Sequence, residues 1–244
     1  MWDDRQVQTI EHRFNGPPDL GHGGYSCAVG AVLVDAPVAA ASLRRPVPLD
    51  TELREERDGD SVKLLDNDDV VIEAGPATLD LDPPPPVSLA EAEATTPLYP
   101  TDLHAFPTCF GCGPHRDPAD SIRIMVGPVE RREDVLADVW VPLEEFGDPV
   151  EGLWVWAALD CPTGWGAVPL NQPPHVLARL TADPAITPIR GGEPHVVTAW
   201  LIDAEGRKRR GGAAIWTADG VLCAKAEGLW IAPRDPGAHG ATRT

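Results

Sequence analysis

A strand, a loop and a strongly apolar stretch of helical length occur in the same order twice in this chain of 244 residues. In the first half, residues 5–14 can form a strand, and "HGGYSCAVGAVLVD" (residues 22–35) is the apolar stretch. In the second half, residues 134–143 alternate in the period of a strand, and "EGLWVWAALDC" (residues 151–161) is the apolar stretch. We therefore expect an internal repeat.

Each half then ends in a strand hairpin. "SVKLLDNDDVVIEAGPATL" has a polar turn at residues 66–69, and "GGAAIWTADGVLCAKAEGLW" has "ADG" at residues 218–220 in the corresponding place. A helix that is apolar all round must be enclosed, so antiparallel strands are expected to curl around each one, and the two units can pair edge to edge. The second half is longer, and its additional residues at 161–175 either extend the helix or form a lid.

Composition shifts divide the chain into four parts. Residues 79–107 are rich in proline and polar residues and are expected to cross between the halves rather than to form a core element. The expected organisation is a first repeat over residues 1–82, a Pro-rich crossover linker over 83–120, a second repeat over 121–233 and a flexible tail over 234–244.

The charge of the chain excludes one class of partner. With 38 acidic and 20 basic residues the formal net charge is −18, which argues against nucleic-acid binding, because that binding depends on neutralising phosphates. No apolar run reaches the roughly 18 residues of a membrane span, and no secretory signal is expected. Five scattered cysteines fit a reducing compartment, so we expect a cytoplasmic protein. No Walker or Rossmann pattern is present, and no cofactor is expected.

The order of five motifs carries a resemblance to a known family. They are "FNGPPDLGHGGY", "RRPVPLDTELREERDGDSVKLLDNDDVVIEA", "FPTCFGCGP", "DPVEGLWVWAALDCP" and "AAIWTADGVLCAKAEGLWI". The chain resembles the hot dog superfamily and, more narrowly, actinobacterial double hot dog proteins of the thioesterase-like type. The resemblance implies an α+β fold, a tandem hot dog with two antiparallel sheets that each wrap around a central apolar helix. It also implies an acyl-CoA or other acyl thioester substrate and a homodimer or higher homo-oligomer.

The first half keeps only part of the catalytic pattern of that family. In hot dog thioesterases of the phenylacetyl-CoA type, an asparagine precedes a His-Gly-Gly, and an acid lies nine residues after the histidine. Asn15, His22, Gly23 and Gly24 match this pattern, but Ala31 stands where the acid is expected. The resemblance makes the N–H groups at the helix start the donors that polarise the thioester carbonyl, which agrees with the positive end of a helix dipole.

The second half keeps the acid. Asp160 lies nine residues after Glu151, while "EGL" replaces the His-Gly-Gly and places Gly152 at its second position. Each half therefore holds what the other lacks. We expect one composite site, in which Gly23 and Gly24 face Asp160 across the internal pseudo-dimer and Asp160 acts as base or nucleophile.

A purely structural explanation stays open for each of these residues. The two glycines can allow close packing at a junction between loop and helix, where His22 caps the helix. Asp160 can be a polar residue that ends a helix before Pro162, since helices usually stop near a proline. Against this, a carboxylate in so apolar a stretch is costly unless it is partnered or functional.

Further residues are candidates for contact with the substrate. Trp154, Trp156 or Trp165 can wall an acyl pocket or pack in the core. The basic run "GRKRRGG" (residues 206–212) is either a solvated hairpin turn or a site for the phosphates of CoA. The candidate substrate-binding residues are Glu151, Gly152, Trp154, Thr163, Arg207 and Arg209.

The segment "HAFPTCFGCGPH" offers four metal-ligand types within twelve residues, namely His104, Cys109, Cys112 and His115. Zinc sites usually draw their second pair from a distant segment, and the other three cysteines are isolated in sequence. The alternative is a turn with two buried thiols, and we assign no metal to the chain.

The sequence as a whole predicts an acyl-CoA thioesterase. Water would attack a thioester whose carbonyl lies at the helix start, with Asp160 as base or nucleophile. The alternative is a non-catalytic protein that binds acyl-CoA or an acyl chain in the same pocket. Thiol release from acyl-CoAs, and its dependence on Asp160, separates the two.

Overall fold

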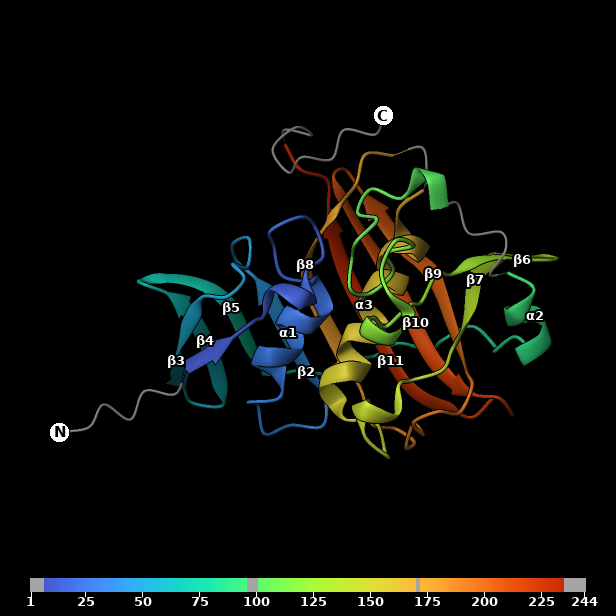
Figure 1. Ribbon diagram of the computed structural model, residues 1–244, viewed down its shortest axis with the longest axis horizontal. Coiled ribbons are helices and arrows are strands. Elements are labelled where there is room, and N and C mark those ends of the chain that lie inside the picture. Colours follow the sequence, from blue (N-terminus) through green and yellow to red (C-terminus); the bar gives the residue numbers. More distant parts are fainter. Residues whose placement is uncertain (1–6, 96–100, 170–171, 235–244) are drawn as a thin grey trace.

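The computed structural model describes residues 7–95, 101–169 and 172–234. Within these ranges an antiparallel sheet of eleven strands runs across the whole molecule, and two apolar helices lie side by side on one of its faces (Figure 1). They are α1 (Gly23–Ala31) and α3 (Gly152–Ala167). The fold is thus α+β, with helices packed on a large antiparallel sheet.

The first half supplies one side of the sheet and the second half the other. The first-half strands, in sheet order, are β1 (Val7–Thr9), β3 (Glu52–Asp58), β4 (Ser61–Asp66), β5 (Asp69–Pro76) and β2 (Ala39–Leu43). The second-half strands continue the order as β8 (Val176–Asp183), β11 (Leu222–Ile231), β10 (Lys208–Thr217), β9 (His195–Glu205), β7 (Arg132–Trp140) and β6 (Gly127–Val129).

The two expected sheets join edge to edge, as the sequence allowed. Strand β2 pairs with β8 from Ala39 opposite Ala182 to Ser42 opposite Arg179, so the two half-sheets form one continuous sheet. A free strand edge leaves a row of backbone N–H and C=O groups unpaired, and each half uses the edge of the other to satisfy them. This pairing also brings α1 against α3.

The apolar helices are enclosed as their sequences indicate. Every residue of α1 after Gly23 is buried, and one hydrophobic core includes side chains from both halves. The hairpins β4–β5 and β10–β11 form where the turn signals predicted them. Among the described residues, no helix has the length and apolar character that crossing a bilayer would require.

Helix α3 does not stop at Pro162. It continues through this proline to Ala167, so part of the additional sequence of the second half extends the helix. Asp160 therefore lies inside a helix and does not end one. Residues 170–171, where a lid was the alternative, lie outside the described residues.

The strand expected at residues 5–14 is much shorter. Only β1 is formed there, and the chain then turns through the 3-10 helix η1 (His12–Phe14). The turn buries Phe14, whose ring stacks on that of Tyr25 with the centroids 3.9 Å apart. Residues 5–6 and the tail from 235 onward lie outside the described residues.

The Pro-rich connection does more than cross the molecule. It contains the short helix α2 (Leu89–Glu93) and the 3-10 helices η3 (Thr101–Leu103) and η4 (Pro118–Asp120), and a further 3-10 helix, η5 (Glu144–Phe146), precedes α3. Its later part, residues 104–117, forms a loop that packs against α3 (Figure 1). In this loop Cys109, Phe110 and Cys112 are buried, so part of the expected linker belongs to the core.

Helix α3 lies so close to the sheet that one strand position tolerates no side chain. A Cβ atom on Gly211 of β10 would collide with the carbonyl oxygen of Thr163 and lie 2.9 Å from the Cβ of Ala167. At the first position of α3, by contrast, a Cβ on Gly152 would meet no atom within 4 Å.

We expect Gly211→Ala to lower the free energy of unfolding by about 1–3 kcal/mol, because the added methyl group must push α3 off the sheet. Gly152→Ala is the matched control, and it should be neutral or stabilising by up to about 1 kcal/mol, since alanine favours helix. Urea unfolding followed by circular dichroism measures both. Equal stability of the two variants would contradict the packing described here.

Candidate active site

The start of α1 meets the middle of α3 at a short hydrogen bond. The backbone N–H of Gly24 donates to Asp160 Oδ2 at 2.6 Å. A Cβ on Gly24 would collide with Asp160 Cβ and lie 2.8 Å from the carbonyl oxygen of Trp156. Gly24 therefore allows the helices to pack closely, but its N–H is taken by Asp160 and is not free to polarise a thioester carbonyl as the resemblance implied.

His22 caps α1 and joins the same group of atoms. Its Nδ1 accepts a hydrogen bond from the N–H of Tyr25 at 3.2 Å, so a neutral ring carries its proton on Nε2. Nε2 lies 3.3 Å from Asp160 Oδ2 and 3.3 Å from Cys161 Sγ. Burial disfavours the protonated form of His22, whereas the negative charges that Cys109 and Asp160 can carry favour it. The effect of these charges is the larger, so the pKa of His22 is raised.

Asp160 is a carboxylate with one oxygen committed and one available. The residue is 2% exposed, and burial raises its pKa to about 6 although His22 and the Gly24 N–H favour the charged form. Its Oδ1 has no hydrogen-bond partner among the described residues. A buried carboxylate oxygen without a partner is expensive, which points to a group that binds or activates a molecule entering the site.

Gly23 offers a second backbone donor beside Asp160. Its N–H belongs to the first turn of α1, where intrahelical acceptors are lacking, and no acceptor for it is found in the described part of the chain. A Cβ on Gly23 would lie 2.9 Å from both Asp160 Oδ2 and Leu177 Cδ2, so a larger residue here would push the start of α1 away from Asp160.

His22, Gly23 and Asp160 line a cavity of about 480 Å³, whereas Gly24 is not part of its wall. The first half, the loop and the second half all contribute to the wall, so Gly23 and the carboxylate of Asp160 share one compartment. Its volume lies within the range of roughly 300–1,000 Å³ of small-molecule sites. The apolar part of the wall is formed by Leu43, Val47, Phe106, Trp165, Val168, Leu177, Trp230 and Ile231.

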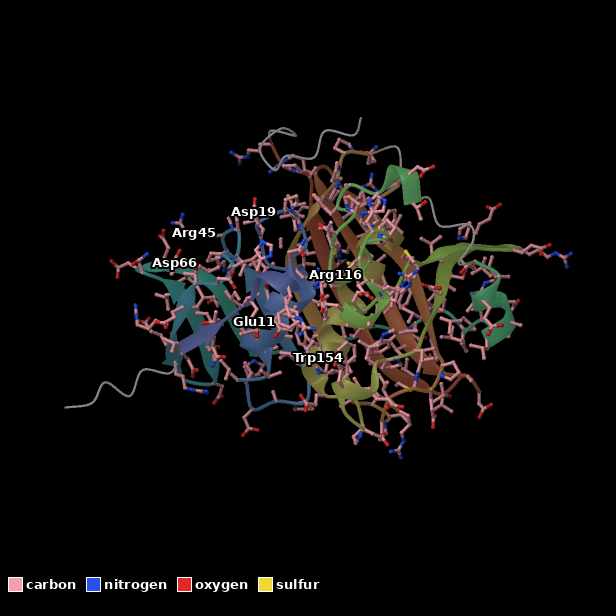
Figure 2. The ribbon with its side chains drawn as sticks, viewed as in Figure 1. Glu11, Asp19, Arg45, Asp66, Arg116 and Trp154 are labelled. Carbon is pink, nitrogen blue, oxygen red and sulfur yellow. The ribbon has the colours of Figure 1, made fainter. Side chains whose placement is uncertain are left out.

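Asn15 lies outside this wall and holds the loop in place. Its Oδ1 accepts a hydrogen bond from Arg116 at 2.8 Å, and its backbone carbonyl accepts one from the N–H of Phe110 at 2.7 Å. Arg116 also donates to the carbonyl of Thr108 and to the carbonyl and carboxylate of Asp120, and it lies near the centre of the view in Figure 2. Asn15 and Arg116 thus connect the first half to the loop.

The residues at the start of α3 do not reach the cavity wall. Glu151 is the exposed N-cap of α3, and Gly152 follows it. The ring of Trp154 stacks on that of Phe146, with the centroids 4.4 Å apart, and also contacts aromatic rings of the first half. Trp154 is therefore part of an aromatic cluster, whereas Trp165 lines the cavity.

Thr163 is buried and does not belong to the cavity wall, but it contacts two residues that do. Its hydroxyl donates to the carbonyl of Asp160 at 2.7 Å and accepts a hydrogen bond from Trp230 Nε1 at 2.9 Å. Thr163 thereby links the turn of α3 that carries Asp160 to an indole of the wall. No pattern in the sequence indicated Trp230, because its role depends on the pairing of β11 with the neighbouring strands.

The expected basic run does not contribute to the cavity wall, whereas two other arginines do. Arg207 donates to the carbonyl of Ala232, and neither it nor Arg209 belongs to the wall. Arg44 and Arg45, which follow β2, belong to it. They are about half exposed, and their partners are Glu73 and Asp69. No pattern in the sequence indicated these two arginines, because only the fold brings them to the cavity.

The cysteines of the loop meet a third cysteine from α3. The sulfur atoms of Cys109 and Cys161 lie 3.8 Å apart, as do those of Cys109 and Cys112. His104 Nε2 lies 3.2 Å from Cys112 Sγ, whereas His115 is exposed. Cys161 stands alone in the sequence, so its place in this cluster could be seen only in the structure.

Comparison with solved structures shows a hot dog fold over nearly the whole chain. A protein from Novosphingobium aromaticivorans, provisionally named a thioesterase, matches with 15% identity and a TM-score of 0.62, covering 96% of this chain and 97% of that one. A hot dog fold protein of unknown function from Alicyclobacillus acidocaldarius matches with 14% identity and a TM-score of 0.60, covering 96% of each chain.

A third structure carries the name of a thioesterase class. A protein from Thermobifida fusca, provisionally named thioesterase II, matches with 16% identity and a TM-score of 0.58, covering 96% of each chain. No protein-family model matches the chain, and comparison with curated proteins finds no match. The solved structures therefore show the fold, and the chemistry must be argued from the site.

We expect Arg116→Lys to loosen the loop, because an ammonium cannot reproduce the several hydrogen bonds that the guanidinium makes. Amides that this loop protects, such as those of Phe110 and Ile122, should exchange hydrogen faster by at least roughly tenfold, equivalent to about 1.4 kcal/mol. Arg131→Lys, at a side chain that is 88% exposed, is the control and should change nothing. Unchanged exchange in the Arg116 variant would show that the loop is held by other contacts.

Proposed function

We propose that this protein hydrolyses acyl thioesters, with Asp160 as the catalytic carboxylate. The observation that carries the proposal is the hydrogen bond from the Gly24 N–H to Asp160 beside the unpartnered N–H of Gly23, at the wall of a largely apolar cavity. The class of reaction also agrees with the names of two proteins of the same fold.

The bound thioester would place its acyl chain against the apolar wall and its carbonyl oxygen at Gly23. The N–H of Gly23, at the positive end of α1, then stabilises the negative charge that develops on that oxygen. Asp160 Oδ1 either takes a proton from an attacking water or attacks the carbonyl carbon itself. In the first case the bond between carbon and sulfur breaks as water adds, and the proton taken up by Asp160 passes to the leaving thiolate. In the second case the thiolate leaves as an anhydride forms between the acyl group and Asp160, and water then hydrolyses this anhydride. Either way one water is consumed, and the products are a carboxylic acid and a free thiol.

The hydrogen bond from Gly24 fixes the direction in which Asp160 acts. Because Oδ2 is held by Gly24 and by the nearby His22 Nε2, Oδ1 is the oxygen that remains for water or substrate. His22 therefore positions the carboxylate. Asn15 contributes indirectly, since it anchors the loop that forms another part of the wall.

Two arginines support coenzyme A as the carrier of the acyl group. Arg44 and Arg45 provide positive charge at the cavity of a strongly acidic protein, where the phosphates of CoA would find complementary charge. We therefore propose that the CoA part of the substrate binds next to Arg44 and Arg45 and not next to Arg207 and Arg209. A homo-oligomer and a cytoplasmic location remain predictions from the sequence.

A protein that binds acyl-CoA without turnover is the second candidate. It is favoured by the same apolar cavity together with the commitment of the Gly24 N–H to Asp160, since a donor that already holds a carboxylate is not free for a substrate. The two candidates differ in whether the thiol is released and whether its release requires Asp160.

We expect Asp160→Asn to lower kcat for acyl-CoA hydrolysis by at least about 100-fold, because the amide can neither accept a proton nor attack. Asp138→Asn is the matched control: Asp138 is equally buried, accepts a hydrogen bond from the N–H of Met125 and lies outside the cavity wall. Release of free thiol from a panel of acyl-CoAs measures both variants. Binding without Asp160-dependent release in the unmodified protein would favour the second candidate.

Arg45→Glu should raise KM for an acyl-CoA by roughly fivefold, corresponding to about 1 kcal/mol for an exposed charge pair. KM for the N-acetylcysteamine thioester of the same acid, which lacks phosphates, should stay unchanged. Arg209→Glu serves as the comparison, because that arginine does not belong to the cavity wall. A larger effect of Arg209→Glu on the CoA substrate would place the carrier at the basic hairpin instead.

A further inference from the structure

Three buried thiols from two distant segments converge beside Asp160. Cys109 and Cys112 come from the loop and are each 4% exposed, and Cys161 comes from α3 and is 7% exposed. Hydrolysis as proposed above uses none of them. Together with Met125 they form a small cluster of buried residues that is separate from the main hydrophobic core.

The sulfur atoms have the spacing of ligands around one small cation. Around a tetrahedral zinc ion with bonds of about 2.3 Å to sulfur, two sulfur ligands lie about 3.8 Å apart. The sulfurs of Cys109 and Cys161 are 3.8 Å apart, and those of Cys112 and Cys109 are also 3.8 Å apart. Two thiols in van der Waals contact can produce this spacing. Here the ligand atoms of Cys109, Cys161 and His22 in addition all lie within 4.8 Å of one another, and Cys112 Sγ adjoins Cys109 Sγ.

The loop is folded so that both of its sulfurs reach the same point. The N–H of Gly113 donates to the carbonyl of Cys109 at 2.8 Å, which closes a tight turn between the two cysteines. A Cβ on Gly113 would lie 2.5 Å from the N atom of Cys109 and 2.6 Å from the carbonyl oxygen of Pro107, so the turn requires glycine. A Cβ on Gly111 would lie 2.6 Å from Cys161 Sγ, so glycine also leaves room for the third sulfur.

Two histidines donate hydrogen bonds toward the sulfurs. His22 and His104 each accept a backbone N–H at Nδ1, at 3.2 Å from Tyr25 and 2.9 Å from Phe106 respectively, so each neutral ring carries its proton on Nε2. These Nε2 atoms lie 3.3 Å from Cys161 Sγ and 3.2 Å from Cys112 Sγ. An N–H group directed at sulfur stabilises the thiolate, which is the form that binds metals.

The cluster brings three thiols close together in a buried place. More than one thiolate there would be repelled by the next. A divalent cation removes this repulsion and allows further thiols to ionise.

We propose that Cys109, Cys112 and Cys161 bind one thiophilic divalent cation, with Zn²⁺ as the expected ion. His22 and His104 donate to the thiolates, and the remaining coordination position is filled by water or a small ligand from the cavity that these cysteines line. The sequence suggested a metal only as an alternative, with ligands confined to residues 104–115, because the contribution of Cys161 could not be foreseen. This site does not depend on the proposed hydrolysis.

The test uses the full chain, purified under reducing conditions and freed of metal with a chelator. Titration with Co²⁺, a spectroscopic substitute for Zn²⁺, should give sulfur-to-cobalt charge-transfer bands that saturate at one equivalent and that Zn²⁺ abolishes. Cys109→Ser and Cys161→Ser should each weaken Zn²⁺ binding at least tenfold. Cys27→Ser and Cys223→Ser are matched controls, since both cysteines are buried outside the cluster, and they should bind as the unmodified protein does.

Two results would overturn the proposal. One is a reduced and folded unmodified protein that shows no charge-transfer bands and retains no Zn²⁺ after dialysis, a result that does not depend on whether any variant folds. The other is metal binding that Cys161→Ser leaves unchanged while its circular dichroism spectrum stays native. Asp160→Asn should retain the metal, so a failure of the hydrolytic proposal would leave this result intact.

Discussion

The hydrogen bond between the Gly24 N–H and Asp160 is the contact on which the site depends. It requires that the first turn of α1 approach α3 more closely than a side chain at position 24 would allow. That approach requires in turn that the two half-sheets be joined through β2 and β8, because this pairing sets the helices side by side. A local backbone property and a long-range strand pairing therefore determine together where the carboxylate lies.

Burying Asp160 carries a penalty that its surroundings offset only in part. Desolvation raises the pKa of the carboxyl group, and one oxygen is stabilised by a helix N-terminus and a nearby imidazole while the other has no partner in the described chain. A carboxylate kept only for stability would be expected to have both oxygens satisfied. The unpartnered Oδ1 of Asp160 therefore fits a carboxylate that contacts a ligand. The loop that carries Cys109 and Cys112 forms part of the cavity wall around it.

Local patterns predicted much of the fold. Apolar helical stretches, alternating strands and turn residues indicated the repeat and its hairpins, and allowed the two units to pair edge to edge. The resemblance to hot dog thioesterases, not a local pattern, singled out Gly23, Gly24 and Asp160, and the structure brings Gly24 and Asp160 together. The sequence could not predict which strands join the two halves, the approach of Cys161 to Cys109, or the position of Arg44 and Arg45 at the cavity. Each of these depends on contacts between distant segments, which spacing along the chain does not encode.

The most direct test of the central claim is a crystal structure with an acyl-CoA analogue in which a methylene group replaces the thioester sulfur, so that the carbonyl remains but cannot be hydrolysed. The account predicts that the acyl chain occupies the cavity, that the carbonyl oxygen lies within hydrogen-bond distance of the Gly23 N–H, and that Asp160 Oδ1 is adjacent to the carbonyl carbon. An analogue bound elsewhere, or a structure in which Asp160 and Gly24 are separated, would contradict it.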